Sequence, residues 1–206
     1  MIKNRSDYLF NLIAPLYGLF YKPQKKHYAR IIEDISDKLD LTAFETVLDV
    51  GCGTGALCSV LNEKSLTVTG IDPAENMLNI ARNKLENKAI RFIKANVVEG
   101  LPFESNSFDI SLASYVAHGL QPEERRRMYA EMSRVSRVKV IIYDYNQNRS
   151  LPITIAEWLE GGDYFRFIRY AKYEMENCEF ELRDCFSEVE VINAGPRTAW
   201  YICTPN

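Results

Sequence analysis

Three glycines within five residues, Gly51, Gly53 and Gly55, follow directly on the apolar run Val47-Leu48-Asp49-Val50. Such a run is typical of a buried parallel strand, and the apolar-periodic segment that begins at Ala56 suits a helix. Glycine turns sharply and has no Cβ to keep a ligand from the backbone. The helix N-terminus adds unpaired N–H groups and a partial positive charge. The stretch therefore predicts a strand, a tight turn and a helix that together bind a polar, nucleotide-like ligand.

The glycine spacing alone leaves the ligand open. Gly51, Gly53 and Ala56 satisfy the G-x-G-x-x-G/A fingerprint of dinucleotide-binding proteins, and Asp72 lies about the expected distance further on. A nicotinamide or flavin cofactor fits this pattern. A turn that only lets the strand and the helix pack together fits it as well.

Two further residues favour a different nucleotide. Asp49 precedes the glycines, Gly55 adds a third glycine, and the resulting string VLDVGCGTG resembles motif I of the class I S-adenosylmethionine (SAM)-dependent methyltransferases. The resemblance implies that SAM lies across the turn and that Asp49 helps to hold the ammonium group of its methionine part. Cys52 lies inside the loop, where we interpret it as a small tolerated side chain and not as a catalytic thiol.

The next strand, expected over residues 66–72, ends in Asp72. Ligands of open α/β sheets bind at the carboxyl ends of the strands, and a carboxylate accepts hydrogen bonds from two ribose hydroxyls well. Asp72-Pro73 followed by Met77-Leu78 resembles the family's post-motif I, whose residues flank the adenine, and the thioether of Met77 suits the face of that ring. Asp72 is also placed to cap the following helix, and the two roles are compatible.

Residues 95–109 resemble the family's A-D-x-x-x-x-L-P-F-x-x-x-S-F-D block. Asn96 stands where Asp is usual, and its amide oxygen can accept the same hydrogen bond from the adenine amino group, so we expect weaker but intact adenine recognition. The resemblance thus assigns the following residues to cofactor binding: Asp49, Gly51, Cys52, Gly53, Gly55, Asp72, Pro73, Met77, Asn96, Val97 and Ser114.

Two residues are candidates for the reacting end of the site. His118 follows the fourth expected strand, Phe108–Ser114, where relatives carry a histidine-containing segment beside the transferable methyl group. An imidazole titrates near neutrality and is a suitable general base, although a histidine that only orders the loop fits the sequence as well. Many enzymes of this class need no base, because catalysis is largely alignment of the reactants.

The second candidate, Tyr17, lies in an N-terminal segment that we expect to form short amphipathic helical pieces interrupted by Pro15 and Gly18. Ile13–Tyr17 resembles the A-x-x-Y-D segment of the ubiquinone/menaquinone-type methyltransferases, with Gly18 in place of Asp. The resemblance implies a lid with Tyr17 near the methionine end of SAM. A helix packed on the sheet edge and a membrane-surface anchor remain alternatives.

Composition limits the classes of molecule that the chain is expected to bind. The 206-residue chain has a formal net charge of −3 and a pI of about 5.6, which gives no basic footprint for nucleic acid. Its five cysteines form no C-x-x-C and no zinc spacing, so we expect reduced thiols in a cytoplasmic protein and no metal. No apolar stretch is long enough for stable membrane insertion. The oligomeric state is undetermined.

The expected fold is α/β: a Rossmann-like, doubly wound, mostly parallel seven-stranded sheet with helices on both faces and a C-terminal antiparallel hairpin, as the resemblance implies. We expect one domain over residues 1–206, with residues 1–40 as a helical lid and 146–185 as a variable, aromatic-rich insert on the substrate side. The predicted function is SAM-dependent methyl transfer to a small, partly apolar acceptor, yielding S-adenosylhomocysteine (SAH). The alternative is a SAM-binding regulatory or scaffold protein without turnover.

Overall fold

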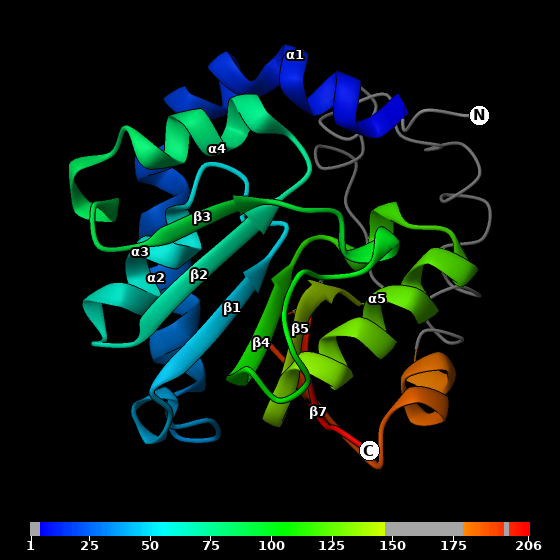
Figure 1. Cartoon of the computed structure of the whole chain (residues 1–206). Coiled ribbons are helices and arrows are strands. Elements are labelled where there is room, and N and C mark those ends of the chain that lie inside the picture. The colour runs from blue at the N-terminus through cyan, green and yellow to red at the C-terminus, as the bar shows by residue number, and fades with distance from the viewer. Residues whose placement is uncertain (1–4, 147–178, 196–197) are drawn as a thin grey trace.

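A seven-stranded sheet forms the centre of the computed structural model, which describes residues 5–146, 179–195 and 198–206. Figure 1 shows helices on both faces of this sheet. The strands are β1 (Thr46–Val50), β2 (Thr67–Asp72), β3 (Arg91–Lys94), β4 (Phe108–Ser114), β5 (Ser136–Tyr145), β6 (Glu188–Asn193) and β7 (Thr198–Thr204). The α-helices are α1 (Arg5–Leu19), α2 (Tyr21–Ile35), α3 (Ala56–Glu63), α4 (Glu75–Arg82) and α5 (Pro122–Val135), with short 3₁₀ turns among the elements.

The strand order is β3-β2-β1-β4-β5-β7-β6. The first five strands in this order are parallel, whereas β7 runs antiparallel to both β5 and β6. This confirms the expected mostly parallel sheet with a C-terminal antiparallel hairpin. Strand order reverses between β1 and β4, and the carboxyl ends of strands at such a switch point are where open α/β sheets bind ligands.

Side chains of the strands alternate between two apolar layers. Val47 points into the layer beneath α2, α3 and α4, and Leu48 points into the layer beneath α5. Both are fully buried. Because the parallel strands are covered on both faces, they are apolar along much of their length. Asp49, Asp72, Ser114 and Asp144 lie at or near their carboxyl ends.

The N-terminal segment differs from the sequence prediction. Residues 5–19 form one continuous helix through position 15 and not separate short pieces. Proline has no N–H to donate to the carbonyl four residues earlier, which belongs to Asn11. That carbonyl accepts a hydrogen bond from Nδ2 of Asn76, at 2.9 Å, so a contact with α4 compensates for the missing helical bond.

Helix α2 ends at Ile35, and β5 begins at Ser136, directly after α5 ends at Val135. Most of the expected insert at 146–185, with its aromatic cluster, lies outside the described residues. In the described part of the chain, no helix combines the length and apolar character needed to cross a membrane.

Candidate functional site

The glycine loop between β1 and α3 has a left-handed backbone. Gly51, Gly53 and Gly55 have φ angles of 72°, 51° and 76°, which side-chain-bearing residues rarely adopt. The N–H groups of Gly51 and Cys52 both donate to the carbonyl of Ile71, at 2.8 and 2.9 Å. The loop is therefore fixed to the end of the neighbouring strand β2.

The surroundings of the three glycines differ. A Cβ added to Gly51 would lie 2.5 Å from Cγ2 of Val116, and one added to Gly55 would lie 2.8 Å from Nδ2 of Asn87. These two glycines permit close packing. A Cβ on Gly53 would meet nothing within 4 Å, so Gly53 is the position at which the loop leaves open space for a ligand.

Asp72 joins the glycine loop to the start of α4. Its Oδ2 accepts the backbone N–H of Gly53 at 2.9 Å, and its Oδ1 accepts the backbone N–H of Ala74 at 2.8 Å. The N-cap of α4 is Ala74 and it has no side-chain cap hydrogen bond, so the expectation that Asp72 caps this helix is wrong: its carboxylate closes a turn just before the helix begins. A carboxylate oxygen can accept more than one hydrogen bond, so both contacts are compatible with binding of ligand hydroxyls.

Asp49 lies beneath the loop and is 1% exposed. Burial raises the pKa of its carboxyl group to about 7, and the nearby charge of Asp72 adds to this effect, although a hydrogen bond from Cys58 opposes it. Sγ of Cys58 lies 3.0 Å from Oδ2 of Asp49. A cation bound beside Asp49 would favour its ionised form, so the site suits a positively charged ligand group.

Two predicted residues from different helices pack together. Met77 of α4 is 2% exposed and forms a small apolar cluster with Ala74 and with Ala14 of α1, against which Tyr17 packs. Tyr17 therefore packs close to the segment that follows Asp72.

The remaining predicted residues already have structural roles. Oδ1 of Asn96 accepts the backbone N–H of Val98 at 3.1 Å, and Oγ of Ser114 donates to the hydroxyl of Tyr28 at 3.2 Å. Val97 is buried in the layer beneath α5. Whether these residues, Pro73 and Cys52 contact a cofactor stays a prediction.

His118 and Asp144 form a closely linked pair. Nδ1 of His118 lies 2.9 Å from Oδ1 of Asp144, and the backbone N–H of His118 donates to Oδ2 at 3.2 Å. Burial acts to raise the pKa of Asp144, but His118 and two backbone N–H groups outweigh it, so the net pKa is lowered. The ionised carboxylate accepts only, so Nδ1 carries the proton and Nε2 is the basic nitrogen of the neutral ring.

Aromatic rings surround this pair. The ring of His118 lies 4.9 Å from that of Tyr145 and 6.5 Å from that of Tyr115, and the two tyrosine rings are 5.1 Å apart. Tyr115 adopts a φ of 57°, an uncommon conformation for a residue with a bulky side chain. The basic nitrogen is therefore on a ring that packs among largely apolar surfaces.

Asp144 is not among the site residues predicted from the sequence. Its position could have indicated it, because Asp144 lies near the carboxyl end of β5. Strand β5 is the neighbour of β4, and the end of β4 leads to His118. Parallel neighbours bring their carboxyl ends to one edge. Among the described residues, no group of three or more His, Cys, Asp or Glu side chains is arranged to hold a metal ion.

Comparison with protein families matches residues 47–139 to a family described as a methyltransferase domain. The chain is 34% identical over 143 residues to the ubiquinone/menaquinone biosynthesis C-methyltransferase UbiE of Campylobacter jejuni, covering 62% of this chain and 57% of that protein. It is 35% identical over 118 residues to an uncharacterised methyltransferase of Bacillus cytotoxicus, covering 56% and 51% of the two chains. The chain thus spans a little over half the length of these relatives.

Solved structures share the fold. A crystal structure of a putative SAM-dependent methyltransferase from Methanococcus maripaludis aligns with a TM-score of 0.68 and 20% identity, covering 100% of this chain and 96% of that one. The magnesium protoporphyrin IX methyltransferase of Synechocystis, with bound SAH, aligns with a TM-score of 0.57 and 15% identity, covering 88% and 83%. At these identities the likeness concerns the fold.

Proposed function

We propose that the chain, which resembles the class I SAM-dependent methyltransferases in its motifs and its fold, transfers a methyl group from SAM to a small, partly apolar acceptor. The observation that carries the proposal is the pair of buried acids, Asp49 and Asp72, on either side of a left-handed glycine loop that is open at Gly53.

The residues around the glycine loop suit SAM. Gly53 leaves open space where a Cβ would stand, Asp49 is a buried acid whose ionised form favours a cation such as the methionine ammonium group, and Asp72 suits the ribose hydroxyls. Met77 and Asn96 are proposed for the adenine. When bound, SAM supplies an activated methyl group on a positively charged sulfur.

At the acceptor end, we assign His118 as the general base. Its Nε2 would take the proton that the acceptor loses, and the resulting imidazolium would be stabilised by Asp144, which is a positioning residue. General acid–base catalysis contributes about 10²–10⁴-fold in rate. Tyr115 and Tyr145 would form apolar walls for the acceptor, and Tyr17 is proposed as part of a lid.

Quinone-type rings are the acceptor class that we propose first. The Campylobacter relative is named for ubiquinone/menaquinone biosynthesis. The hydroquinone form of such a ring combines an apolar face with ionisable hydroxyl groups, which matches His118 among tyrosines. We further propose that one catalytic domain spans residues 1–206, with residues 1–40 as the lid and 146–185 on the acceptor side.

A thermal-shift comparison of SAH, SAM and NAD tests cofactor binding. A ligand at about 100 times its dissociation constant stabilises by roughly 2.7 kcal/mol, which corresponds to about 5–10 °C for a domain of this size. We expect shifts with SAM and SAH that disappear in Asp72→Asn, whose amide still accepts a backbone N–H. A shift with NAD alone would overturn the assignment and return the loop to the dinucleotide-binding proteins.

A turnover assay separates the enzyme from a SAM-binding regulator. SAH formation is measured with SAM and a panel of hydroquinones and phenols of increasing apolar character. Acceptor-dependent SAH that requires His118 supports the proposal. Tight binding of SAM without SAH formation from any member of the panel would favour the regulatory or scaffold alternative.

A further inference from the structure

Helix α1 carries apolar side chains on two faces. One face packs on α4 through Ala14, which is fully buried beside Met77 and Ala74. The side chains of the other face project outward at spacings of four and three residues, and Phe20 follows them at the N-cap of α2. We call these four residues the outward stripe. Its members and their exposed fractions are Leu12 (65%), Leu16 (55%), Leu19 (77%) and Phe20 (52%).

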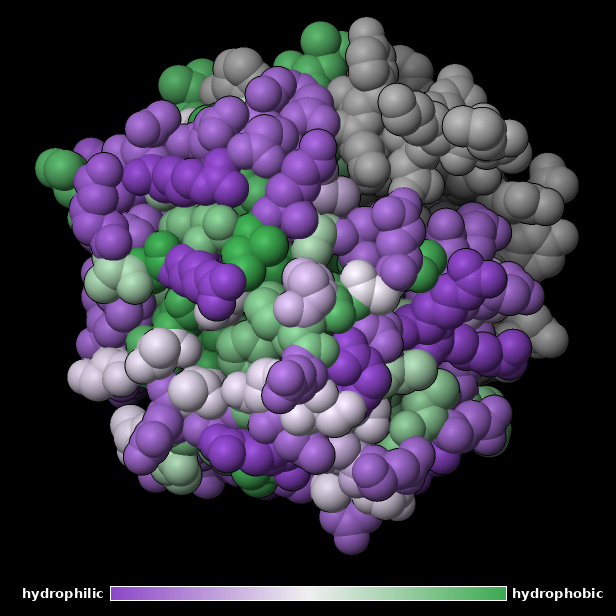
Figure 2. Space-filling view, viewed as in Figure 1, coloured by the Kyte–Doolittle hydropathy of each residue, from purple (hydrophilic) through white to green (hydrophobic). Residues whose placement is uncertain are grey.

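Exposed apolar side chains are concentrated in this segment. Of the eight large apolar side chains that are exposed among the described residues, four lie within residues 12–20. Figure 2 shows hydrophobic side chains along the upper edge of the molecule, where α1 runs in Figure 1. Scattered exposed leucines need no explanation, but several on one helix face indicate a surface that meets an apolar partner.

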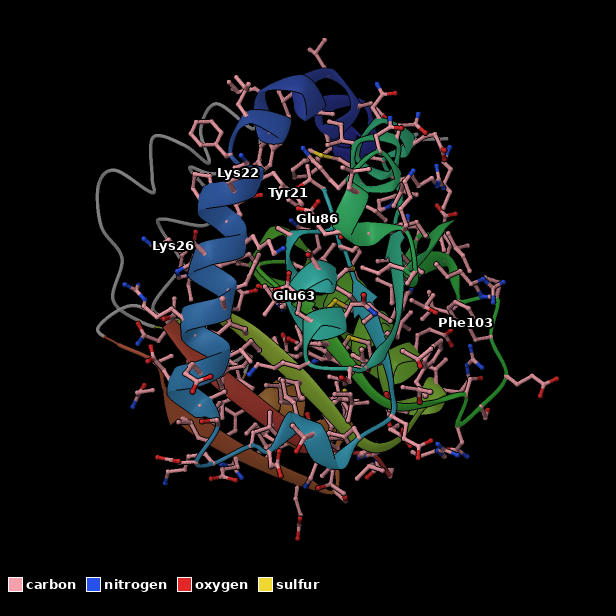
Figure 3. All side chains as sticks on the ribbon, turned by 90° about the vertical axis from the view of Figure 1, so that its left-hand side faces the viewer. Tyr21, Lys22, Lys26, Glu63, Glu86 and Phe103 are labelled. Atoms are coloured by element: carbon pink, nitrogen blue, oxygen red, sulfur yellow. The ribbon has the colours of Figure 1, made fainter. Side chains whose placement is uncertain are left out.

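Helix α2 continues directly from this stripe and carries a row of cations. Lys22, Lys26 and Arg30 recur every four residues and are all exposed; we call them the basic row. Figure 3 shows Lys26 on the side of α2 opposite Glu63. Among the described residues, none of the three cations takes part in an ion pair.

The acids of α2 are at its other end. Glu33 and Asp34 lie in the last turn, and Glu33 pairs with Lys64 of the turn after α3 at 3.5 Å. The cations thus gather next to α1, although the whole chain carries a net charge of −3. An apolar stripe beside a local excess of Lys and Arg is the pattern of a helix that lies on an anionic lipid surface.

We propose that the outward stripe and the basic row together form a docking surface for an anionic phospholipid bilayer. The leucines and Phe20 would enter the boundary between headgroups and acyl chains, and the cations would contact lipid phosphates. A second copy of the chain fits less well, because a symmetric contact brings the two basic rows together, and four side chains are few against the 20–30 residues a side of a standard interface.

The proposed docking surface lies close to the proposed methyl-transfer site. Helix α1 packs on α4, which begins just after Asp72 at the carboxyl edge of the sheet, so a docked bilayer would lie near the proposed site. An apolar acceptor could then enter from the lipid phase. This use rests on the proposed function, whereas the docking surface itself does not.

Vesicle flotation tests the proposal with the full chain. Vesicles of phosphatidylcholine are compared with vesicles that also contain phosphatidylglycerol, at low and high salt. We expect binding to the anionic vesicles that weakens with salt. Leu12→Ser with Leu16→Ser should weaken it by roughly tenfold per leucine, and Lys22→Gln with Lys26→Gln by about fivefold per charge.

Matched controls are available in the turn after α4. Leu85 is 82% exposed and Lys88 is also exposed, so Leu85→Ser and Lys88→Gln make the same chemical changes elsewhere and should leave vesicle binding unchanged. The melting temperature of the ligand-free protein should be retained in every variant, which shows that the fold is intact.

Three results would overturn the docking surface. These are absence of binding to either type of vesicle, an equal loss in the control variants, and a concentration-dependent dimer in sedimentation velocity that is abolished by Leu12→Ser with Leu16→Ser. Failure of the proposed function gives a different result, because SAH would then not shift the wild-type protein whether or not vesicles bind.

Discussion

A single carboxylate holds His118 by both its ring and its backbone: Oδ1 of Asp144 lies 2.9 Å from Nδ1, and Oδ2 accepts the backbone N–H at 3.2 Å. Asp144 is 2% exposed and also accepts the N–H of Tyr145 at 2.8 Å. The end of β5 thereby fixes both the position of the turn after β4 and the tautomer of its histidine.

Asp144→Asn should lower the turnover number by about 10²-fold, within the range for loss of general base catalysis, because an amide can present its oxygen or its NH₂ to Nδ1 and no longer stabilises an imidazolium. SAH affinity should change little. The measurement is kcat by SAH formation beside Kd for SAH, with His118→Asn as the comparison. If Asp144→Asn retains full kcat while His118→Asn does not, Asp144 has no positioning role.

Asp49→Asn should stabilise the protein without ligand at alkaline pH. The folded state raises the pKa of Asp49 from 3.8 to about 7, so folding retains a proton that the unfolded chain releases. The contribution of Asp49 to the free energy of unfolding is therefore greatest below pH 4, falls as pH rises toward 7, and then levels off. Asn has no such dependence, so the advantage of the variant should grow by about 2–3 kcal/mol between pH 5 and pH 8.

The check on Asp49 is urea denaturation of the wild type and the variant at several pH values in that range. SAH should stabilise the variant less than the wild type, because the acid for the ammonium group is gone. An advantage that is the same at pH 5 and pH 8 would contradict the raised pKa.

Gly53→Ala should cost little stability and most of the SAH affinity. A Cβ there meets no protein atom within 4 Å, so the main cost is the left-handed backbone, about 1–2 kcal/mol. Gly100→Ala is a control at a glycine outside the loop that also has open surroundings. Its backbone, at φ 100° and ψ 146°, lies outside the left-handed region, so we expect a larger loss of stability there than at Gly53. We expect titration calorimetry to show SAH binding lost in the first variant and kept in the second.

Arg125→Met should destabilise the fold by about 3–5 kcal/mol, the usual cost of leaving a buried charge without its partner. Nε of Arg125 donates to Glu181 at 2.9 Å, Nη2 donates to the same carboxylate at 3.1 Å, and Nη1 donates to the carbonyl of Leu120 at 2.8 Å. The pair thus links residues 179–185 to the turn that carries His118.

The double variant Arg125→Met with Glu181→Met provides the comparison, because it removes both charges together. Unfolding free energies from urea titration should show the double variant to be less destabilised than the sum of the two single variants. Simple additivity would mean that the two residues do not act as a pair.

Local sequence determined the strands, the glycine turn and the acids at the strand ends. An apolar run followed by glycines has few alternatives, since the backbone needs glycine for left-handed φ and the buried strands need apolar side chains on both faces. For this reason α3 begins at Ala56 and β4 spans Phe108–Ser114, as the sequence predicted, and Asp49 and Asp72 lie beside the glycine loop.

Tertiary structure alone decided which distant residues meet. The pairing of His118 with Asp144, the contact of Asn11 with Asn76 that carries α1 past Pro15, and the bidentate link of Arg125 to Glu181 join segments with no common sequence pattern. These contacts depend on strand order and helix packing. Both set the distances between segments, and those distances cannot be derived from the periodicity of any single segment. Local preference therefore fixed the elements and the glycine loop, and the arrangement of the sheet brought His118 and Asp144 together.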